Sequence, residues 1–530
     1  MKTTLPKLTA AWPLVIFLLS PALTRAETAV QAWVQRYNGP GNGEDYARAV
    51  VADGSNNVIV TGGSFSSTGY SSSDYATIKY SSAGVPLWTN RYNGPGNNWD
   101  TATAVAVDGS NNVIVTGNLK TSLDSYIYDY ATIKYSSGGV PLWTNRYNGP
   151  GNRNDVALAV AVDGSNNVVV TGYSDVNGYG TNYDYVTIQY SSAGVGLWTN
   201  RYNGPGNSGD YAFALAVDGS NNVVVTGSTY GGSSDFYATI KYSSAGVPLW
   251  TNLYKGWIDG ANMAWAVAVD TSGNVYVTGE SAGCCFYPYY FDYATIKYSS
   301  AGEPLWTNRY DGPGTSYDYA RAIAVDTNGN VNVTGYSWGS GSGYDYATIQ
   351  YSSAGVPLWT NRYNGPGNGE DAAIAIAVDR SNNVIVTGSS TGSGGYSDCL
   401  TIKYSSAGVP LWTNRYNGPG NGASAMAVDR SGNVIVTGSS TGSGGNADFA
   451  TIKYICVPEP VMSGLQPTNG TFQVRVDEVL QPGTLVIEAS TNLAGWSPVF
   501  TNTTPTNVLF YTDPEAGNHL WRFYRAFQFP

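Results

Sequence analysis

Carboxyl groups recur at two fixed places in this chain, and paired carboxyl groups are what glycoside hydrolysis requires. The first set follows the NGPGN string or its equivalent in six copies, and Glu44 and Glu370 stand beside two of its members. The second set comes later in the same repeat, where Phe236 replaces the acid in the fourth copy. The first set is Asp45, Asp100, Asp155, Asp210, Asp318 and Asp371; the second is Asp74, Asp129, Asp184, Asp292, Asp345, Asp398 and Asp448.

The regular recurrence of these acids favours a structural role. An aspartate in a turn accepts hydrogen bonds from nearby backbone N–H groups, and it recurs wherever the turn recurs. A catalytic pair would have to differ from its counterparts in the other copies, and neither set does. We expect turn hydrogen bonds for the first set, and a turn or a hydrogen bond between neighbouring repeats for the second.

Other catalytic and metal-binding arrangements find little support. The single histidine, His519, lies near the C-terminus, which excludes a Ser-His-Asp triad or a multi-histidine metal centre within the repeats. The strings at 270–274 and 326–330, DTSGN and DTNGN, resemble calcium loops but lack the closing bidentate acid of a twelve-residue EF-hand. We interpret them as hairpin turns and expect no cofactor, with calcium as the alternative.

Aromatic side chains in the connecting segments give the one positive indication of function, because loops on a rigid scaffold are where binding usually occurs. The copy from Leu253 to Tyr298 departs most from the others: leucine replaces arginine and KGWIDGAN replaces NGPGN. A unique binding site would produce this departure, and so would drift in a tolerant repeat. The candidate ligand-binding residues are Trp257, Trp265, Phe286, Tyr287, Tyr289, Tyr290, Trp338, Tyr126 and Tyr179.

These residues belong to a unit of roughly 52 to 56 residues that recurs eight times between Trp33 and Tyr454. In the second copy, residues 103–108, 112–117, 129–135 and 141–147 are rich in β-branched and aromatic types and are bounded by Gly, Asn, Ser or Pro, which predicts four strands. Tight DGSNN and SSAG turns join the first strand to the second and the third to the fourth. Each unit is therefore a four-stranded antiparallel meander, the blade of an all-β propeller.

The chain ends predict how the ring closes. Seven copies have an intact hairpin between the third and fourth strands, but the strand at 450–454 lacks an outer partner. The strand at 32–37 precedes the first blade and has no blade of its own. Pairing these two strands gives eight blades and leaves no unprotected edge at the closure.

Strand alternation places two kinds of connection on each end of the ring. The first-to-second and third-to-fourth turns share one end, where the copies are nearly identical; we call this the uniform end. The NGPGN connections and the second-to-third loops share the other end, where the copies differ; we call this the variable end. The candidate aromatic residues are assigned to the variable end.

The repeat resembles the bacterial β-propeller family labelled SBBP, through the strings AVAVD, NVIVTG or GNVYVTG, and DYATIKY. A weaker likeness to delta-60 repeats is carried by KYSSAG. The resemblance covers about four-fifths of the chain, and the repeat lacks the WD dipeptide of WD40 units and the paired glycines of kelch units. It implies an exported bacterial propeller and brings no defined catalytic residues.

Residues 1–26 have the pattern of a secretory signal, with Lys2 and Lys7 before an apolar run and a small-residue exit at Ala26. The alternative, a membrane anchor, would need about 20 apolar residues. Removal of this segment takes away Lys2, Lys7 and Arg25, so the net charge of −11 becomes −14. We expect a secreted, extracellular or cell-surface protein, with the periplasm as an alternative, no membrane span after signal removal and no nucleic-acid partner.

The four cysteines form no disulfide framework. Cys284 and Cys285 could form a vicinal bridge, but we expect packed or incidental thiols for these two and for Cys399 and Cys456. We expect the propeller to span residues 27–456.

A stiff linker is expected at 457–460, opening a C-terminal module at 457–530. Strands at 472–476, 484–489, 508–511 and 521–527 predict an immunoglobulin-like or fibronectin-like β-sandwich.

These observations favour a secreted, non-catalytic binding scaffold whose variable end engages a glycan or an extracellular protein. Tyr and Trp rings stack on sugars and give contact area at low entropic cost. The alternatives are a carbohydrate hydrolase or lyase that uses Asp or Glu on the same face, and a structural surface protein. Ligand identity, oligomeric state and the purpose of the C-terminal module are not predicted.

Overall fold

The computed structural model describes residues 27–529 apart from 67–71, 122–126, 178–181, 284–289, 315, 418–421, 443, 459–460, 466–471, 478–483, 493–494, 507, 516–517 and 519–521. The expected signal segment and His519 lie outside the described residues. The secondary-structure elements of the described part are all strands. Accordingly, no helix there is long and apolar enough to cross a membrane.

Eight four-stranded sheets form the ring. From innermost to outermost strand, blades 1 to 4 are β2(Asp45–Ala52), β3(Val58–Phe65), β4(Ser73–Tyr80), β5(Pro86–Tyr92); β6(Asp100–Val107), β7(Val113–Lys120), β8(Tyr128–Tyr135), β9(Pro141–Tyr147); β10(Asp155–Val162), β11(Val168–Asp175), β12(Tyr183–Tyr190), β13(Gly196–Tyr202); and β14(Asp210–Val217), β15(Val223–Tyr230), β16(Asp235–Tyr242), β17(Pro248–Tyr254). Blades 5 to 8 are β18(Asn262–Val269), β19(Val275–Ala282), β20(Phe291–Tyr298), β21(Pro304–Tyr310); β22(Asp318–Val325), β23(Val331–Gly339), β24(Gly343–Tyr351), β25(Pro357–Tyr363); β26(Asp371–Val378), β27(Val384–Thr391), β28(Ser397–Tyr404), β29(Pro410–Tyr416); and β30(Gly422–Val428), β31(Val434–Thr441), β32(Ala447–Pro458), β1(Glu27–Tyr37).

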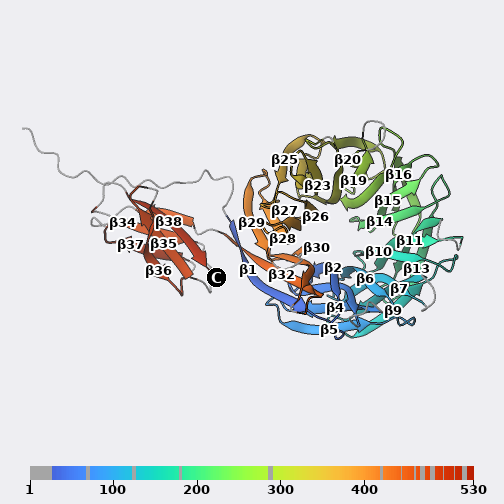
Figure 1. The fold of residues 1–530 in the computed structure, drawn as a ribbon, viewed down its shortest axis with the longest axis horizontal. Helices are drawn as coiled ribbons and strands as arrows, with labels where there is room; N and C mark the ends of the chain where they lie inside the picture. Colours follow the sequence, from blue (N-terminus) through green and yellow to red (C-terminus); the bar gives the residue numbers. More distant parts are fainter. Residues whose placement is uncertain are drawn as a thin grey trace, which may run out of the picture. The chain divides into compact units, whose positions relative to one another are not determined.

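Figure 1 shows the blades arranged radially, with β2, β6, β10 and their counterparts around the centre. The four strands predicted in the second copy are present as β6 to β9, but β6 begins at Asp100, three residues earlier than predicted. The reason is a bulge: Ala102 and Ala104 pair with consecutive residues of β7, so Thr103 has no cross-strand partner. The predicted first strand therefore covered only the part after the bulge.

Hydrophobic packing occurs between blades. Ile59 and Tyr75 of blade 1 lie in one buried cluster with Val113 and Ile133 of blade 2, and equivalent clusters follow around the ring. The second and third strands are almost fully buried because neighbouring blades cover both faces. The outermost strands alternate between exposed and partly buried residues, as their mixed faces predict.

The predicted closure is confirmed. β1 is the outermost strand of the sheet that contains β32, β31 and β30. Ile435 and Phe449 of blade 8 share a buried cluster with Val58 and Ile78 of blade 1. The N-terminal strand thus completes the last blade, and the ring has eight blades.

A tryptophan and a glycine lock neighbouring blades together at the uniform end. Trp88 donates its indole N–H to the carbonyl of Ser137 in the next blade at 3.1 Å. Gly139 has a φ of 86°, and a Cβ added there would lie 2.8 Å from the Trp88 ring, so only glycine fits. Blade 8 has no such turn, and the buried indole N–H of Trp412 has no partner among the described residues.

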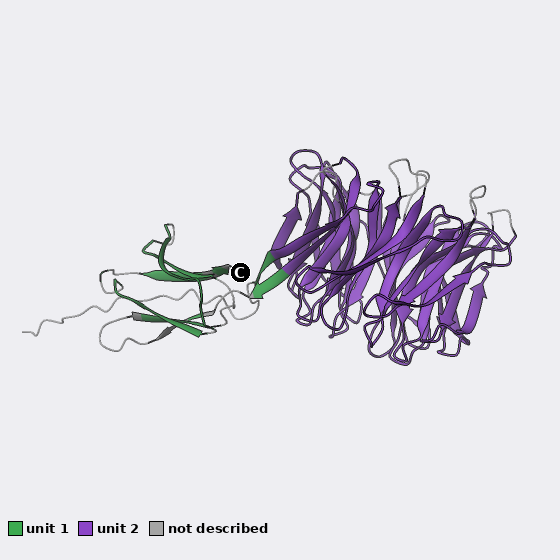
Figure 2. Ribbon diagram, turned by 90° about the horizontal axis from the view of Figure 1, so that it is seen from below, with its two compact units in different colours: residues 1–30, 455–530 green, residues 31–454 purple. Residues whose placement is uncertain are grey.

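The chain divides into two compact units, residues 31–454 in one and residues 1–30 with 455–530 in the other (Figure 2). β32 continues to Pro458, beyond the start of the expected linker, while 459–460 lie outside the described residues. The C-terminal residues form two three-stranded sheets, ordered β33-β34-β37 and β36-β35-β38. Their bounds are β33(Val461–Leu465), β34(Phe472–Asp477), β35(Thr484–Ser490), β36(Ser497–Asn502), β37(Val508–Asp513) and β38(Phe523–Phe529).

Residues of both C-terminal sheets, including Val474, Leu485 and Leu509, form one hydrophobic cluster. Four of the six strands overlap those predicted, while β33 and β36 were not predicted. Among the described cysteines, Cys399 is a buried free thiol, and Cys456 is partly buried. Burial raises the pKa of Cys399 to about 12, so it is an unreactive packed thiol.

Candidate functional site

The two ends of the ring differ in how their loops are held. At the uniform end the turns of neighbouring blades bond to one another: the backbone N–H of Gly54 donates to the side chain of Asn111 at 2.8 Å. At the variable end the connection entering a blade bonds to that blade's second-to-third loop, as when Gly206 N–H donates to the carbonyl of Tyr230 at 3.0 Å. Each pair of variable segments is therefore one surface unit.

The first set of aspartates supports the turns of the variable end, as predicted. Each carboxylate accepts the backbone N–H of the glycine six residues earlier; for Asp210 and Gly204 the distance is 2.6 Å. The hydroxyl of Thr229 also donates to Asp210. In the fifth copy Asn262 replaces the acid and accepts from Gly256 and Ser281 in the same way. The other pairs are Gly39–Asp45, Gly94–Asp100, Gly149–Asp155, Gly312–Asp318 and Gly365–Asp371.

Burial raises the pKa of these carboxyl groups. For Asp100, Asp155, Asp210 and Asp318 the pKa is raised to about 6, because enclosure disfavours the charged form more than the hydrogen bonds favour it. A pKa near 6 would suit a general acid. However, these side chains are at most 1% exposed, so no substrate reaches them. Their raised pKa values therefore affect how the stability of the ring depends on pH, and they give no support for catalysis.

The second set of aspartates forms ion pairs, not the turn hydrogen bonds that were considered. Asp74 accepts from Arg91 on the outermost strand of the same blade at 2.8 Å. Arg91 also reaches Tyr37 of the neighbouring blade at 3.1 Å, so the expected contact between repeats is made by the arginine. The equivalent pairs are Arg146–Asp129, Arg201–Asp184, Arg309–Asp292, Arg362–Asp345, Arg415–Asp398 and Arg36–Asp448.

Blade 4 lacks both members of this ion pair. Phe236 stands in place of the aspartate, and Leu253 stands in place of the arginine. The two positions lie on the paired strands β16 and β17, so both partners of one ion pair are replaced in this blade. Leu253 is 43% exposed and therefore does not bury the apolar surface that it introduces.

The calcium-like strings are hairpin turns, as predicted. One carboxylate oxygen of Asp270 accepts the backbone N–H groups of Ser272 and Asn274, both at 2.9 Å. The other accepts from the amide of Asn274 and from the hydroxyl of Tyr276. Asp326 is bonded in the same way by Asn328 and Asn330. Protein donors thus occupy the oxygens that a cation would need.

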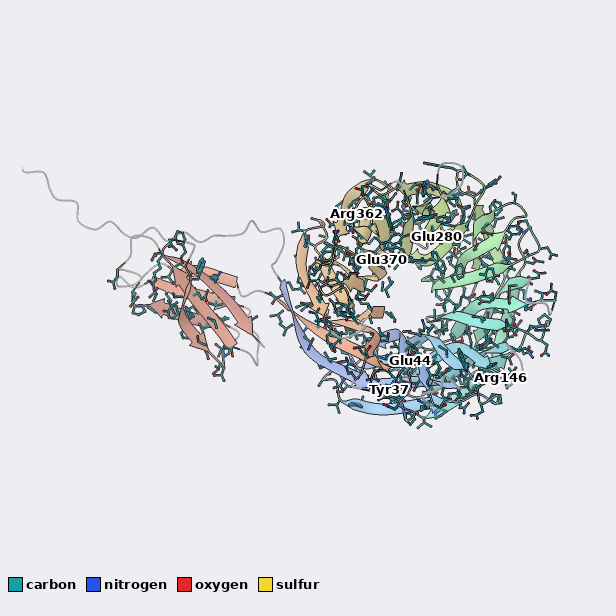
Figure 3. The ribbon with its side chains drawn as sticks, viewed as in Figure 1. Tyr37, Glu44, Arg146, Glu280, Arg362 and Glu370 are labelled. Atoms are coloured by element: carbon teal, nitrogen blue, oxygen red, sulfur yellow. The ribbon has the colours of Figure 1, made fainter. Side chains whose placement is uncertain are left out.

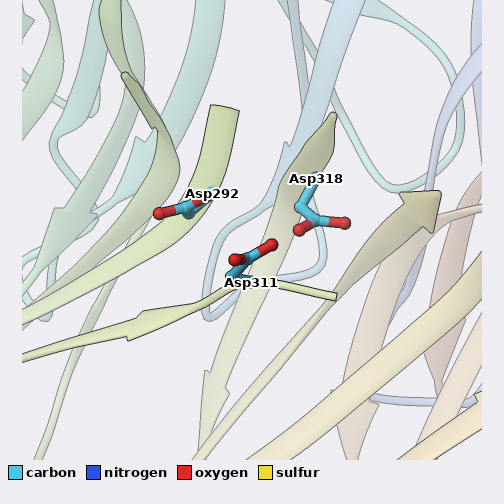
Figure 4. Close-up of side chains that lie close together, drawn as sticks. All are labelled: Asp292, Asp311 and Asp318. Atoms are coloured by element: carbon cyan, nitrogen blue, oxygen red, sulfur yellow. The ribbon is translucent and has the colours of Figure 1, made fainter. Parts of the chain in front are cut away.

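A group of three acids lies at the entry to blade 6 (Figure 4). Oxygens of Asp292, Asp311 and Asp318 lie within 4.8 Å of one another. Asp311 stands where most copies have asparagine. Asp292 is already paired with Arg309 at 2.8 Å, and Asp318 holds the backbone of Gly312. Asp311 is therefore an extra negative charge, and its proximity is one reason why the pKa values of Asp292 and Asp318 are raised, after burial.

The structure describes four of the nine predicted ligand-binding residues. Trp257 is 74% exposed, with the guanidinium of Arg309 4.6 Å from its ring centre. Trp338 is 37% exposed and packs edge-on against Tyr344, and Tyr290 packs against Tyr317. The fourth, Trp265, is described below. Phe286, Tyr287, Tyr289, Tyr126 and Tyr179 lie outside the described residues, as do Cys284 and Cys285.

Trp265 is not an open stacking platform. Phe213 of blade 4 stacks on its indole with a centroid distance of 4.4 Å, and the guanidinium of Arg321 in blade 6 lies 4.7 Å from the indole centre. The indole N–H donates to Glu280 at 2.9 Å. Glu280 lies closer to the centre of the ring than Arg362 does (Figure 3). Burial raises the pKa of Glu280, opposed by Arg321 and by the bond from Trp265.

Phe213, Trp265 and Arg321 occupy one position in three successive blades. Each is the bulged residue of its innermost strand, without a cross-strand partner. The residues at this position in the remaining blades are Arg48, Thr103, Leu158, Ile374 and Ser424. The sequence contains this signal as one highly variable residue inside the otherwise uniform A-x-A string, a signal from which no site was predicted.

A continuous run of ring contacts crosses blades 3 to 6 at the variable end. Tyr173 packs against Tyr211, which is stacked parallel to Phe213, next to Trp265. Beyond Arg321 the run continues through Tyr319, Tyr336, Tyr344 and Trp338. We call this set of residues the aromatic run. It joins residues of four blades into one contiguous surface element.

The exposed aromatic rings of the described propeller are confined to the variable end. They come from the segment entering a blade, from the end of its second strand or from the loop between its second and third strands. The exposed Val and Leu residues of the repeated VPL strings, such as Val85 and Leu87, instead follow the turns of the uniform end. Only two of the exposed rings, Trp257 and Trp338, were predicted from the sequence. The full set is Trp99, Tyr230, Trp257, Trp338 and Tyr396.

Comparison with known families supports the resemblance drawn from the sequence. Residues 306–341 match the model of the family described as SBBP, beta-propeller repeat. This segment runs from β21 through the first two strands of blade 6. A search of curated proteins finds no match to the chain.

Three solved structures that resemble the chain do so at 9–13% identity. A gluconolactonase from Xanthomonas campestris is 13% identical, with 55% of this chain and 90% of that chain covered and a TM-score of 0.29. A polysaccharide lyase is 11% identical, with 66% and 89% covered and a TM-score of 0.40. Drosophila Plexin A in complex with Semaphorin 1b is 9% identical, with 81% and 88% covered and a TM-score of 0.38. Similarity at this level carries no argument about activity.

Proposed function

We propose that this eight-bladed β-propeller with SBBP-type repeats is a non-catalytic scaffold that binds a glycan at its variable end. The observation that carries the proposal is the confinement of exposed aromatic rings to that end, beside the aromatic run. Flat aromatic faces stack on sugar rings, and Tyr and Trp give large contact areas at low entropic cost. Rings spread over several blades suit an extended chain better than a single small sugar.

The repeated carboxyl groups support binding over hydrolysis. Hydrolysis of a glycosidic bond needs two carboxyl groups that flank the bond and reach it. The first set is enclosed and bonded to glycine N–H groups, and the second set is bonded to arginines. A hydrolase or lyase at the same face remains the alternative, and it would have to use acids outside these two sets, such as Glu44 or Glu370.

We also propose that the chain is exported and acts outside the cell or at its surface. The apolar segment within residues 1–26 and the net charge of −14 after its removal support this location. The mass and N-terminal sequence of the protein recovered from its native host test it, because export by this route requires cleavage near Ala26.

The test of binding is a screen of the mature chain against polysaccharides, with titration of those that bind. Replacing Trp99, Trp257 or Trp338 by alanine should weaken binding by about 2- to 10-fold each, since one ring contact contributes about 0.5–1.5 kcal/mol. Leu87→Ala and Leu358→Ala, which also remove exposed apolar side chains but near the uniform end, serve as controls and should bind like the parent.

Two results would contradict the proposal. Binding that is equally reduced by the leucine and tryptophan substitutions would show that exposed apolar area matters and its position does not. Release of reducing ends or unsaturated products from a bound polysaccharide would establish the enzyme alternative instead.

A further inference from the structure

Arg321 is held in place by aromatic rings. It is the bulged residue of β22, and its guanidinium lies 4.7 Å from the ring centre of Trp265 and 5.2 Å from those of Tyr319 and Tyr336. Cations lie favourably over the faces of such rings. The side chain is 24% exposed, so solvent or a ligand reaches it. The arginine is therefore fixed in position without being sealed off.

The guanidinium of Arg321 has few hydrogen bonds. It donates one, to the hydroxyl of Tyr336 at 2.7 Å, and its contact with Glu280 is longer, at 3.6 Å. Arg309, by contrast, donates to the carboxylate of Asp292, to the hydroxyls of Tyr254 and Ser281, and to two backbone carbonyls. A guanidinium has five N–H donors. Among the described residues, Arg321 thus leaves most of its donors without a partner.

Glu280 balances the charge of Arg321 without using its donors. Glu280 is buried, with its side chain 9% exposed, and its carboxylate accepts the indole N–H of Trp265 at 2.9 Å. The pair is electrostatically compensated within the ring, while the hydrogen-bonding face of the guanidinium stays available. A planar anion with two oxygens fits such a face, because a guanidinium binds carboxylates through two parallel N–H···O bonds.

We propose that Arg321 makes the site selective for a carboxylated sugar unit, so that the glycan is an acidic polysaccharide of the uronic acid class. The inference rests on the proposed glycan binding and adds the chemical class of the ligand. The sugar ring packs against the rings that continue from Arg321 through the partly buried Tyr336 and Tyr344 to the exposed Trp338. The sugar's carboxylate pairs with the free donors of Arg321, which no other residue of the aromatic run could do.

The test compares two forms of one polymer. Polygalacturonate and its fully methyl-esterified form share a backbone and differ in charge, and alginate serves as a second uronate polymer. The parent should bind the charged form about 10- to 100-fold more tightly at physiological salt, since hydrogen bonds to charged groups contribute about 1.5–3 kcal/mol.

The variants isolate the guanidinium. Arg321→Gln alone would leave Glu280 buried without its counter-charge, so it is combined with Glu280→Gln to keep the pair neutral. This double variant should lose the preference for the charged polymer and bind the charged and esterified forms with similar affinity. Arg321→Lys keeps the charge and should recover only part of the preference, because an ammonium lacks the planar fork. Arg380→Gln, in an exposed turn at the uniform end, is the control that removes a positive charge elsewhere and should keep the preference.

The outcomes separate this inference from the proposed function. A parent that binds glycans through its tryptophans but prefers no charged form retains the proposed function and overturns the role of Arg321. A double variant with an unchanged melting temperature and an unchanged preference overturns it as well. A parent that binds no polysaccharide, charged or neutral, overturns both.

Discussion

Replacing Asp210 by asparagine should change the pH dependence of stability. Asp210 opens β14, is fully buried, and has a pKa of about 6 in the folded ring, against an ordinary 3.8. A carboxyl group whose pKa is raised by folding stabilises the protein below pH 3.8, and this stabilisation is lost as the pH rises through 6. Asn262, at the equivalent place in blade 5, shows that a neutral amide can hold the same glycine N–H.

The magnitude follows from the two pKa values. Their difference corresponds to about 3 kcal/mol of unfolding free energy between pH 3 and pH 8, of which about 2 kcal/mol falls between pH 4.5 and pH 8. Because asparagine does not titrate, the stability of Asp210→Asn relative to the parent should rise by about 2 kcal/mol over that range. Urea denaturation followed by tryptophan fluorescence, at constant ionic strength, measures it.

Asp218, which follows the other end of the same strand, is the matched control. Its burial is outweighed by hydrogen bonds from Asn222 and Lys241, so its pKa is lowered. Its stabilisation is present above pH 3.8 and is lost as the pH falls through the lowered pKa. Asp218→Asn should therefore be less stable than the parent at pH 8, with a smaller deficit in acid. If the relative stability of Asp210→Asn is constant or falls as the pH rises, the carboxylate is ionised in the ring at no cost and our reasoning is wrong.

Three further substitutions test the scaffold. Gly139→Ala should destabilise the ring by about 2–4 kcal/mol in denaturant titrations, because it combines a left-handed φ with a clash against Trp88, whereas Gly196→Ala, with nothing within 4 Å, should be neutral. Lys241→Met should lower the unfolding free energy by about 3–5 kcal/mol at pH 8, because it removes the ammonium that lies 2.9 Å from the buried carboxylate of Asp218. A smaller loss would mean that water solvates this carboxylate. Asp311→Asn should raise the melting temperature at pH 8, because it removes the third charge of the acid group. The rise should correspond to roughly 0.5–1 kcal/mol of unfolding free energy. Added calcium should leave the difference between variant and parent unchanged.

The repeat alone was enough to predict the architecture. Strand alternation and the Asn, Gly and Asp residues of the turns act locally, so they can be read from one copy. The orphan strands ending at Tyr37 and Tyr454 then predicted the closure. The hydrogen bonds of the first aspartates were predictable for the same reason, since Asp210 and Gly204 are six residues apart.

The centre of the candidate site was not predictable in this way. Phe213, Trp265 and Arg321 are separated by more than 50 residues along the chain, and they meet only because each occupies the bulge of its strand. Bulges shift the register by one residue, which period-two patterns do not reveal. Likewise, Phe236 and Leu253 are visible in the sequence as separate departures, and only the pairing of β16 with β17 shows that they replace the two partners of one ion pair.

Closure by the first strand also decides where the ring can be joined to something else. β1 runs toward the variable end and β32 runs away from it, so both chain connections leave blade 8 from the uniform end. An attachment made directly at the start of β1 or at the end of β32 would therefore lie at the uniform end, opposite the loops that carry the exposed aromatic rings.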